Sequence, residues 1–183
     1  MKPSHILFLF MGLMVSACSG IVTSHSVPPG SSYYFHDIER SVRNGGLYAE
    51  VVGNPFGGSS FDFERRVRRL MDVNVAGVPM RFVEKSSPLR SEKYHVVVWF
   101  NPTQDPRRLN LCTHLGGVAF HRDPKRLEVA MALCAGKKRL TEASGIVHNV
   151  QGQESPVFRE LVASVTGELF PQQSGDVETR QYQ

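Results

Sequence analysis

Seven consecutive residues constrain the fold of this 183-residue chain more than any others. Residues 94–100 read YHVVVWF, and six of these seven are apolar or aromatic, with no polar alternation. A strand of that composition has both faces buried and therefore belongs in the interior of a sheet. It should end at Asn101-Pro102, because proline has no backbone N–H to donate to a neighbouring strand. We expect the domain to be built around a central strand over residues 94–100.

Further strands are expected on both sides of this central strand. Short apolar runs bounded by turn residues predict them, and these runs cover residues 47–52, 80–84, 127–134 and 141–150. One more run, over residues 116–121, is expected to form a hairpin with residues 127–134 around Asp123-Pro124.

Two amphipathic helices complete the expected domain. The first has Ser59 or Ser60 as its N-cap and ends near residues 74–77. Its apolar stripe has helical spacing and consists of Phe63, Val67, Leu70 and Met71. The second helix begins at Ser155-Pro156 and cannot continue through Pro171. The order of elements predicts an α+β fold with two layers, in which a mostly antiparallel sheet is covered by the two helices.

Composition limits the classes of protein to consider. Hydrophobic residues make up 41% of the chain and charged residues 21%, which is typical of one globular domain. Twenty-one Lys and Arg against 17 Asp and Glu give a net charge of +4. That excess is too small to indicate nucleic acid as a partner.

The N-terminal residues have the pattern of an export signal. Lys2 supplies a positive charge, and residues 6–14 form an apolar run interrupted only by Gly12. A helix needs about 20 apolar residues to cross a bilayer, so this run is too short to span one. Its length suits the hydrophobic region of a signal peptide.

The four residues that follow, Val15-Ser16-Ala17-Cys18, resemble the lipobox of bacterial lipoproteins. The resemblance implies cleavage before Cys18, a diacylglycerol on its sulfur and a further acyl chain, such as palmitate, on its new amine. Ser19-Gly20 follow with no aspartate, which favours the outer membrane, with the domain facing the periplasm. The periplasmic side of the inner membrane is the alternative. A further alternative is an ordinary secretory signal in which Cys18 is incidental.

The chain therefore divides into four parts. Residues 1–17 are the signal peptide, and residues 18–43 are the lipidated cysteine with a flexible tether rich in Ser, Gly and Pro. Residues 44–171 form the single α+β domain. Residues 172–183 have little to bury and are expected to be a disordered tail.

The two other cysteines, Cys112 and Cys134, predict a disulfide, since disulfides persist in exported proteins. In the expected hairpin the two cysteines miss direct opposition by one residue, and a β-bulge at Gly116-Gly117 would correct the register. Zinc held by these cysteines with His114 and His121 is an alternative, because these are ligand types that zinc prefers. Free thiols are a third reading.

Motifs for catalysis are not found. The sequence has no G-x-S-x-G, no P-loop lysine and no H-E-x-x-H. Nothing in the sequence spacing of His95 and Asp105 indicates a catalytic pair. We expect His95 to be a structural histidine in the central strand. We therefore predict no catalytic residue, no cofactor and no metal ligand.

Arginines cluster on the first helix. A helical wheel places Arg65, Arg68 and Arg69 opposite the apolar stripe, as an exposed basic ridge. The ridge can be a solvated face with ion pairs four residues apart, Glu64–Arg68 among them. It can instead bind an anionic surface such as lipid headgroups, cell-wall carboxylates or an acidic partner.

Two hypotheses about function follow. The first is a lipid-anchored envelope lipoprotein with a non-catalytic periplasmic domain that binds or scaffolds a protein or cell-wall partner. The second is an envelope enzyme, hydrolase-like, with a site that the fold assembles around His95, His114 or His121. A crevice that joins one of these histidines to a carboxylate or a nucleophile would favour the enzyme.

Overall fold

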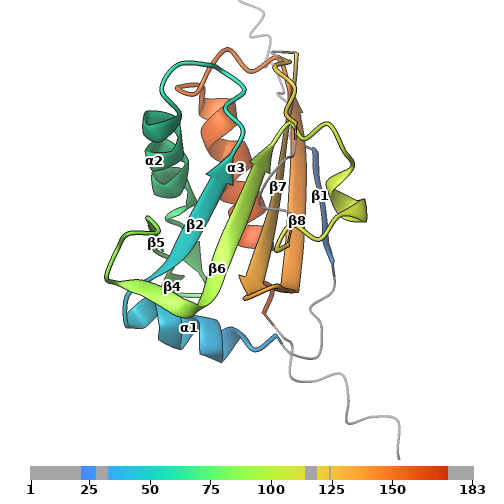
Figure 1. Ribbon diagram of the computed structural model, residues 1–183. Helices are drawn as coiled ribbons and strands as arrows, with labels where there is room; N and C mark the ends of the chain where they lie inside the picture. Colours follow the sequence, from blue (N-terminus) through green and yellow to red (C-terminus); the bar gives the residue numbers. More distant parts are fainter. Residues whose placement is uncertain (1–21, 28–32, 114–118, 124, 173–183) are drawn as a thin grey trace, which may run out of the picture.

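The computed structural model of the protein describes residues 22–27, 33–113, 119–123 and 125–172 (Figure 1). One mixed sheet has the strand order β1-β8-β7-β6-β2-β5. Its strands are β1 (Val22–Val27), β2 (Gly46–Val52), β5 (Phe82–Val83), β6 (Arg90–Phe100), β7 (Arg126–Ala135) and β8 (Lys138–His148). The other elements are α1 (Phe35–Arg43), α2 (Ser60–Met71), α3 (Pro156–Glu168), a short 3-10 helix (Pro106–Arg108) and a separate strand pair, β3 (Asn74–Val75) with β4 (Val78–Pro79).

The fold is α+β with a mostly antiparallel sheet, as the sequence predicts. The pairs β1–β8, β8–β7 and β7–β6 are antiparallel, whereas β6–β2 and β2–β5 are parallel. The predicted central strand is β6, which lies between β2 and β7 with both faces of its second half buried. This position explains why its sequence does not alternate between apolar and polar residues.

Both predicted helices are present and lie over one face of the sheet (Figure 1). Ser59 caps α2, since its hydroxyl accepts a hydrogen bond from the backbone N–H of Asp62 at 3.2 Å. Phe63 of α2 and Phe158 of α3 meet Phe100 of β6, with ring centroids 5.1 to 6.0 Å apart. This aromatic cluster joins the helices to the sheet.

The prediction of a flexible tether over residues 18–43 is wrong, because two segments of it are folded. One of them is a helix, so the described residues contain three α-helices rather than the predicted two. Residues 22–27 form β1, which pairs with β8 at the edge of the sheet. Residues 35–43 form α1, whose Ile38 and Val42 are buried in the main core. A helix this short offers one pair of apolar residues four apart, too little periodicity to identify it from sequence.

The predicted hairpin between residues 116–121 and 127–134 is also wrong. Strand β7 pairs instead with β8, across a turn formed by Gly136 and Lys137. Gly136 has a φ of +57°, a left-handed conformation that suits glycine in a tight turn. Residues 114–118 lie outside the described residues, and Phe120 forms an isolated bridge with Pro102 of the β6–β7 connection.

Cys112 and Cys134 form the predicted disulfide, with their Cα atoms 5.7 Å apart. The hairpin register from which we expected it is not the cause of the pairing. Cys112 lies in the connection between β6 and β7, which covers the sheet face opposite the helices, and Cys134 points from β7 into that cover. A second, smaller apolar cluster around Trp99 and Leu111 surrounds the bond.

Candidate binding groove

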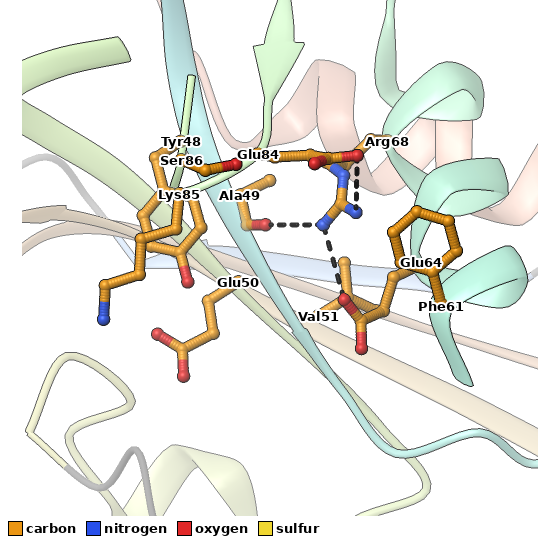
Figure 2. A pocket seen from close by; sticks show the side chains of 10 residues that line it. All are labelled: Tyr48, Ala49, Glu50, Val51, Phe61, Glu64, Arg68, Glu84, Lys85 and Ser86. Atoms are coloured by element: carbon orange, nitrogen blue, oxygen red, sulfur yellow. Dashed lines mark hydrogen bonds and ion pairs between the residues drawn. The ribbon is translucent and has the colours of Figure 1, made fainter. Parts of the chain in front are cut away.

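A groove runs along one edge of the sheet, between β2, α2 and the turn after β5. It has a volume of about 390 Å³. Its lining residues are Tyr48, Ala49, Glu50, Val51, Phe61, Glu64, Arg68, Glu84, Lys85 and Ser86 (Figure 2). We call it the edge groove.

The groove exists because β5 is too short to cover β2. Strand β5 pairs with β2 only at Leu47 and Tyr48, so the described part of the chain supplies no strand beside residues 49–52 on that side. Alternate residues of a strand direct their backbone N–H and C=O groups to the same edge. The carbonyl of Ala49 faces the groove, and the backbone groups of Val51 have the same direction.

Arg68 closes part of this edge. Its Nη1 atom donates a hydrogen bond to the Ala49 carbonyl at 3.3 Å, and its guanidinium lies 3.6 Å from the Glu64 carboxylate and 3.8 Å from that of Glu84. Figure 2 shows these three contacts as dashed lines around one buried guanidinium. A buried charge requires such partners, because an unpaired cation would lose its hydration without compensation.

The prediction that Arg68 belongs to an exposed basic ridge is therefore wrong: Arg68 is only 7% exposed. The helical wheel places it away from the apolar stripe, but the open edge of β2 lies alongside that part of α2. The arginine stem packs there and its head bonds to Ala49. The predicted Glu64–Arg68 ion pair is present.

Arg65 and Arg69 are exposed, as predicted. Arg65 pairs with Asp62 at 2.7 Å and lies over the ring of Phe61. Binding of these two arginines to an anionic surface stays a prediction.

The groove carries more acidic than basic side chains. Glu50, Glu64 and Glu84 line it together with Arg68 and Lys85. Burial, assisted by the negative charge of Glu50, raises the pKa of Tyr48 to about 12, so its hydroxyl keeps its proton at neutral pH. The groove therefore offers the backbone groups of Val51, which no strand in the described part of the chain pairs on this side. It also offers hydroxyl and carboxylate acceptors and the apolar ring of Phe61, which is 57% exposed.

The structure does not bring the candidate catalytic residues together. His95 is half-buried on β6, where its ring stacks with Tyr48 at a centroid distance of 6.3 Å. Asp105 bonds instead to Arg107, which holds the pKa of the Asp105 carboxyl below its usual range. His121 is exposed and His114 lies outside the described residues.

The zinc alternative is not supported by the cysteines, which are joined to each other. Within the ranges that the structure describes, no three His, Cys, Asp or Glu side chains are placed to hold a metal ion. In those same ranges no helix is long and apolar enough to cross a membrane.

His95 should make the protein less stable in mild acid. Burial lowers the pKa of its imidazole below the usual 6.5. The unfolded chain then binds the proton more readily than the folded protein, so stability that is present above about pH 6.5 is lost as the pH falls toward the folded pKa. His95→Gln should flatten the fall of the urea midpoint between about pH 7 and pH 5. An NMR titration that placed the folded His95 imidazole at or above pH 6.5 would contradict this expectation.

Comparisons with known proteins find little. No family model matches the chain, and no curated protein matches it. Among solved structures, the PelC dodecamer from Paraburkholderia phytofirmans is 12% identical, with a TM-score of 0.42, and the match covers 84% of this chain and 100% of that one. A point variant of the same PelC dodecamer, in another crystal form, is also 12% identical, with a TM-score of 0.39 and coverage of 70% and 90%. Both TM-scores are too low to establish a shared fold.

Proposed function

We propose that this protein is a lipid-anchored envelope lipoprotein whose domain binds an extended segment of a partner protein in the edge groove. The anchor is Cys18, at the end of the lipobox, and the membrane is the outer membrane with the domain in the periplasm. The inner membrane is the alternative. Cys18 and residues 173–183 of the expected tail lie outside the described residues.

The open edge of β2 is the observation that carries the proposal. An extended peptide can add to such an edge through main-chain hydrogen bonds, while grooves beside the edge select its side chains. Helices α2 and α3 lie over one sheet face, and the described part of the chain places no strand beside the residues of β2 after Tyr48 on this side. The Ala49 carbonyl on this edge already accepts a hydrogen bond from Arg68, so an added strand would pair at Val51, beside that guanidinium.

Side chains around the edge indicate the chemistry of the segment. Phe61 provides an exposed aromatic surface for an apolar side chain. Glu50, Glu64 and Glu84 provide negative charge, and the two basic residues of the groove, Arg68 and Lys85, offset only part of it. The occupant is therefore an extended segment with at least one Lys or Arg and one apolar side chain. An anchored domain needs only modest affinity, since the anchor raises its effective concentration at the membrane.

Site-specific photocrosslinking in intact cells tests the groove. A photoreactive phenylalanine analogue at position 61 should capture a discrete partner protein, and Glu50→Lys should reduce the yield by repelling a basic segment. The matched control is the same analogue at Tyr34, an aromatic residue that is also 57% exposed but lines a different part of the surface. The same products from both positions, or none from position 61, would count against the groove.

Membrane fractionation tests the anchor separately. Cys18→Ala should release the protein from the membrane fraction or block its processing, because the acylated sulfur is lost. A variant that still fractionated with membranes like the wild type would refute lipid anchoring at Cys18.

A further inference from the structure

We infer that the end of the sheet at which β1 begins faces the membrane, and that Arg122, Lys125 and Arg126 contact anionic phospholipid headgroups there. This inference rests on the proposed acylation of Cys18. It goes further by naming the face of the domain and the lipid chemistry that it meets.

Only a short length of chain separates the anchor from the fold. Strand β1 begins at Val22, so only residues 19–21 separate it from Cys18. A fully extended chain spans at most about 3.6 Å per residue, so the four steps from Cys18 to Val22 span at most about 14 Å. The start of β1 must therefore stay close to the bilayer surface, in place of the long tether that the sequence predicts.

The strand register identifies which other residues lie at the end of the sheet where β1 begins. Val22 pairs with Ile146 near the end of β8, and His148 of β8 pairs with Arg126 at the start of β7. The backbone N–H of Asn149 also donates to the Lys125 carbonyl at 3.0 Å. The basic residues before β7 and the start of β1 are therefore at the same end of the sheet, the upper end in Figure 1.

Positive charge predominates among the side chains before and at the start of β7. Arg122 and Lys125 are exposed and form no ion pair within the described ranges, while Arg126 pairs with Glu128 at 2.8 Å. The nearby Asp123 carboxylate accepts a hydrogen bond from the Lys125 backbone N–H at 2.8 Å. Cations outnumber carboxylates here, and each Lys or Arg close to an anionic leaflet favours contact.

The shape of this end suits a headgroup. A hollow of about 310 Å³ lies between the end of β6 and the start of β7. It is lined by Asn101, Pro102, His121, Arg122, Asp123 and Arg126. The opposite end of the sheet is too far from the start of β1 to contact the same membrane surface, because β8 is 11 residues long and extends about 33 Å.

Lysine acetylation on vesicles tests the inference. The full acylated protein is purified from membranes, and its intact mass first establishes the acyl chains. It is then reconstituted in vesicles of phosphatidylcholine, or of phosphatidylcholine with phosphatidylglycerol, and treated with a water-soluble acetylating reagent. Phosphatidylglycerol should slow acetylation of Lys125 about threefold or more. Lys137, exposed in the β7–β8 turn at the opposite end, is the internal control and should not change.

Charge-reversal variants complete the test. Arg122→Glu should abolish the protection of Lys125 by phosphatidylglycerol, whereas Arg65→Glu with Arg69→Glu should leave it intact. Equal acetylation of Lys125 on both kinds of vesicle, with acyl chains present, would overturn the inference and leave the anchor standing. Loss of the protection of Lys125 only in the Arg65/Arg69 variant would overturn the inference and would indicate that α2 contacts the headgroups instead. An unacylated protein would refute the proposed anchor itself, and the inference with it.

Discussion

Replacing Phe63 with alanine should lower the free energy of unfolding by about 3–5 kcal/mol. Phe63 is 1% exposed, and its ring lies within 6.1 Å, centroid to centroid, of Phe56, Phe100 and Phe158. Truncation removes buried apolar surface and leaves a cavity at the junction of α2, α3 and β6, which rigid aromatic neighbours fill poorly. Urea denaturation should show a lower midpoint with an unchanged slope.

The matched control for this substitution is Phe61→Ala. Phe61 lies on the same helix and is 57% exposed, so its truncation should change stability by less than about 0.5 kcal/mol. The same change should weaken capture of a partner in the edge groove. A similar loss of stability in both variants would show that the aromatic cluster is not the junction we describe.

Breaking the Cys112–Cys134 disulfide should lower the free energy of unfolding by about 3 kcal/mol, since the bond closes a loop with a sequence separation of 22. The bond also holds the connection between β6 and β7 over the sheet face that carries Trp99. Because Trp99 is the only tryptophan of the chain and is fully buried, its fluorescence reports on this cover. A reductant should lower the urea midpoint and shift the Trp99 emission to the red.

The control is a protein with Cys112→Ala and Cys134→Ala, studied with Cys18→Ala so that no other thiol reacts. This variant should have a lower urea midpoint than the Cys18→Ala protein, and its midpoint should not change when reductant is added. Two titratable thiols in the unreduced, denatured Cys18→Ala protein would contradict the disulfide.

Local signals predict the elements that depend on their own residues. The central strand follows from an apolar run that only an interior position can bury, and α2 follows from its cap at Ser59 and its apolar stripe. The strand expected over residues 141–150 is β8, close to its true extent. The disulfide follows from the count of cysteines and the predicted export signal, which do not depend on strand pairing.

Long-range pairing could not be predicted in the same way. Strand β7 has two apolar neighbours in sequence that could form a hairpin with it, and the Gly136-Lys137 turn selects β8. Helix α1 could not be predicted, because its two buried residues, Ile38 and Val42, are identified as core residues only by the tertiary structure. The edge groove was missed for a related reason: its residues come from three separate segments, and none of them carries a motif.

The amino-acid sequence alone therefore determined the α+β class, the interior strand, the two longer helices and the identity of the bonded cysteines. Each of these depends on hydrophobic periodicity, capping or cysteine number, which act over a few residues. The tertiary structure decided which strand lies beside β7, that β1 and α1 belong to the domain, and that Arg68 is buried. Those outcomes depend on which backbone edges and apolar faces meet in space, and a side chain such as Arg68 receives its partners only after β2 and α2 have come together.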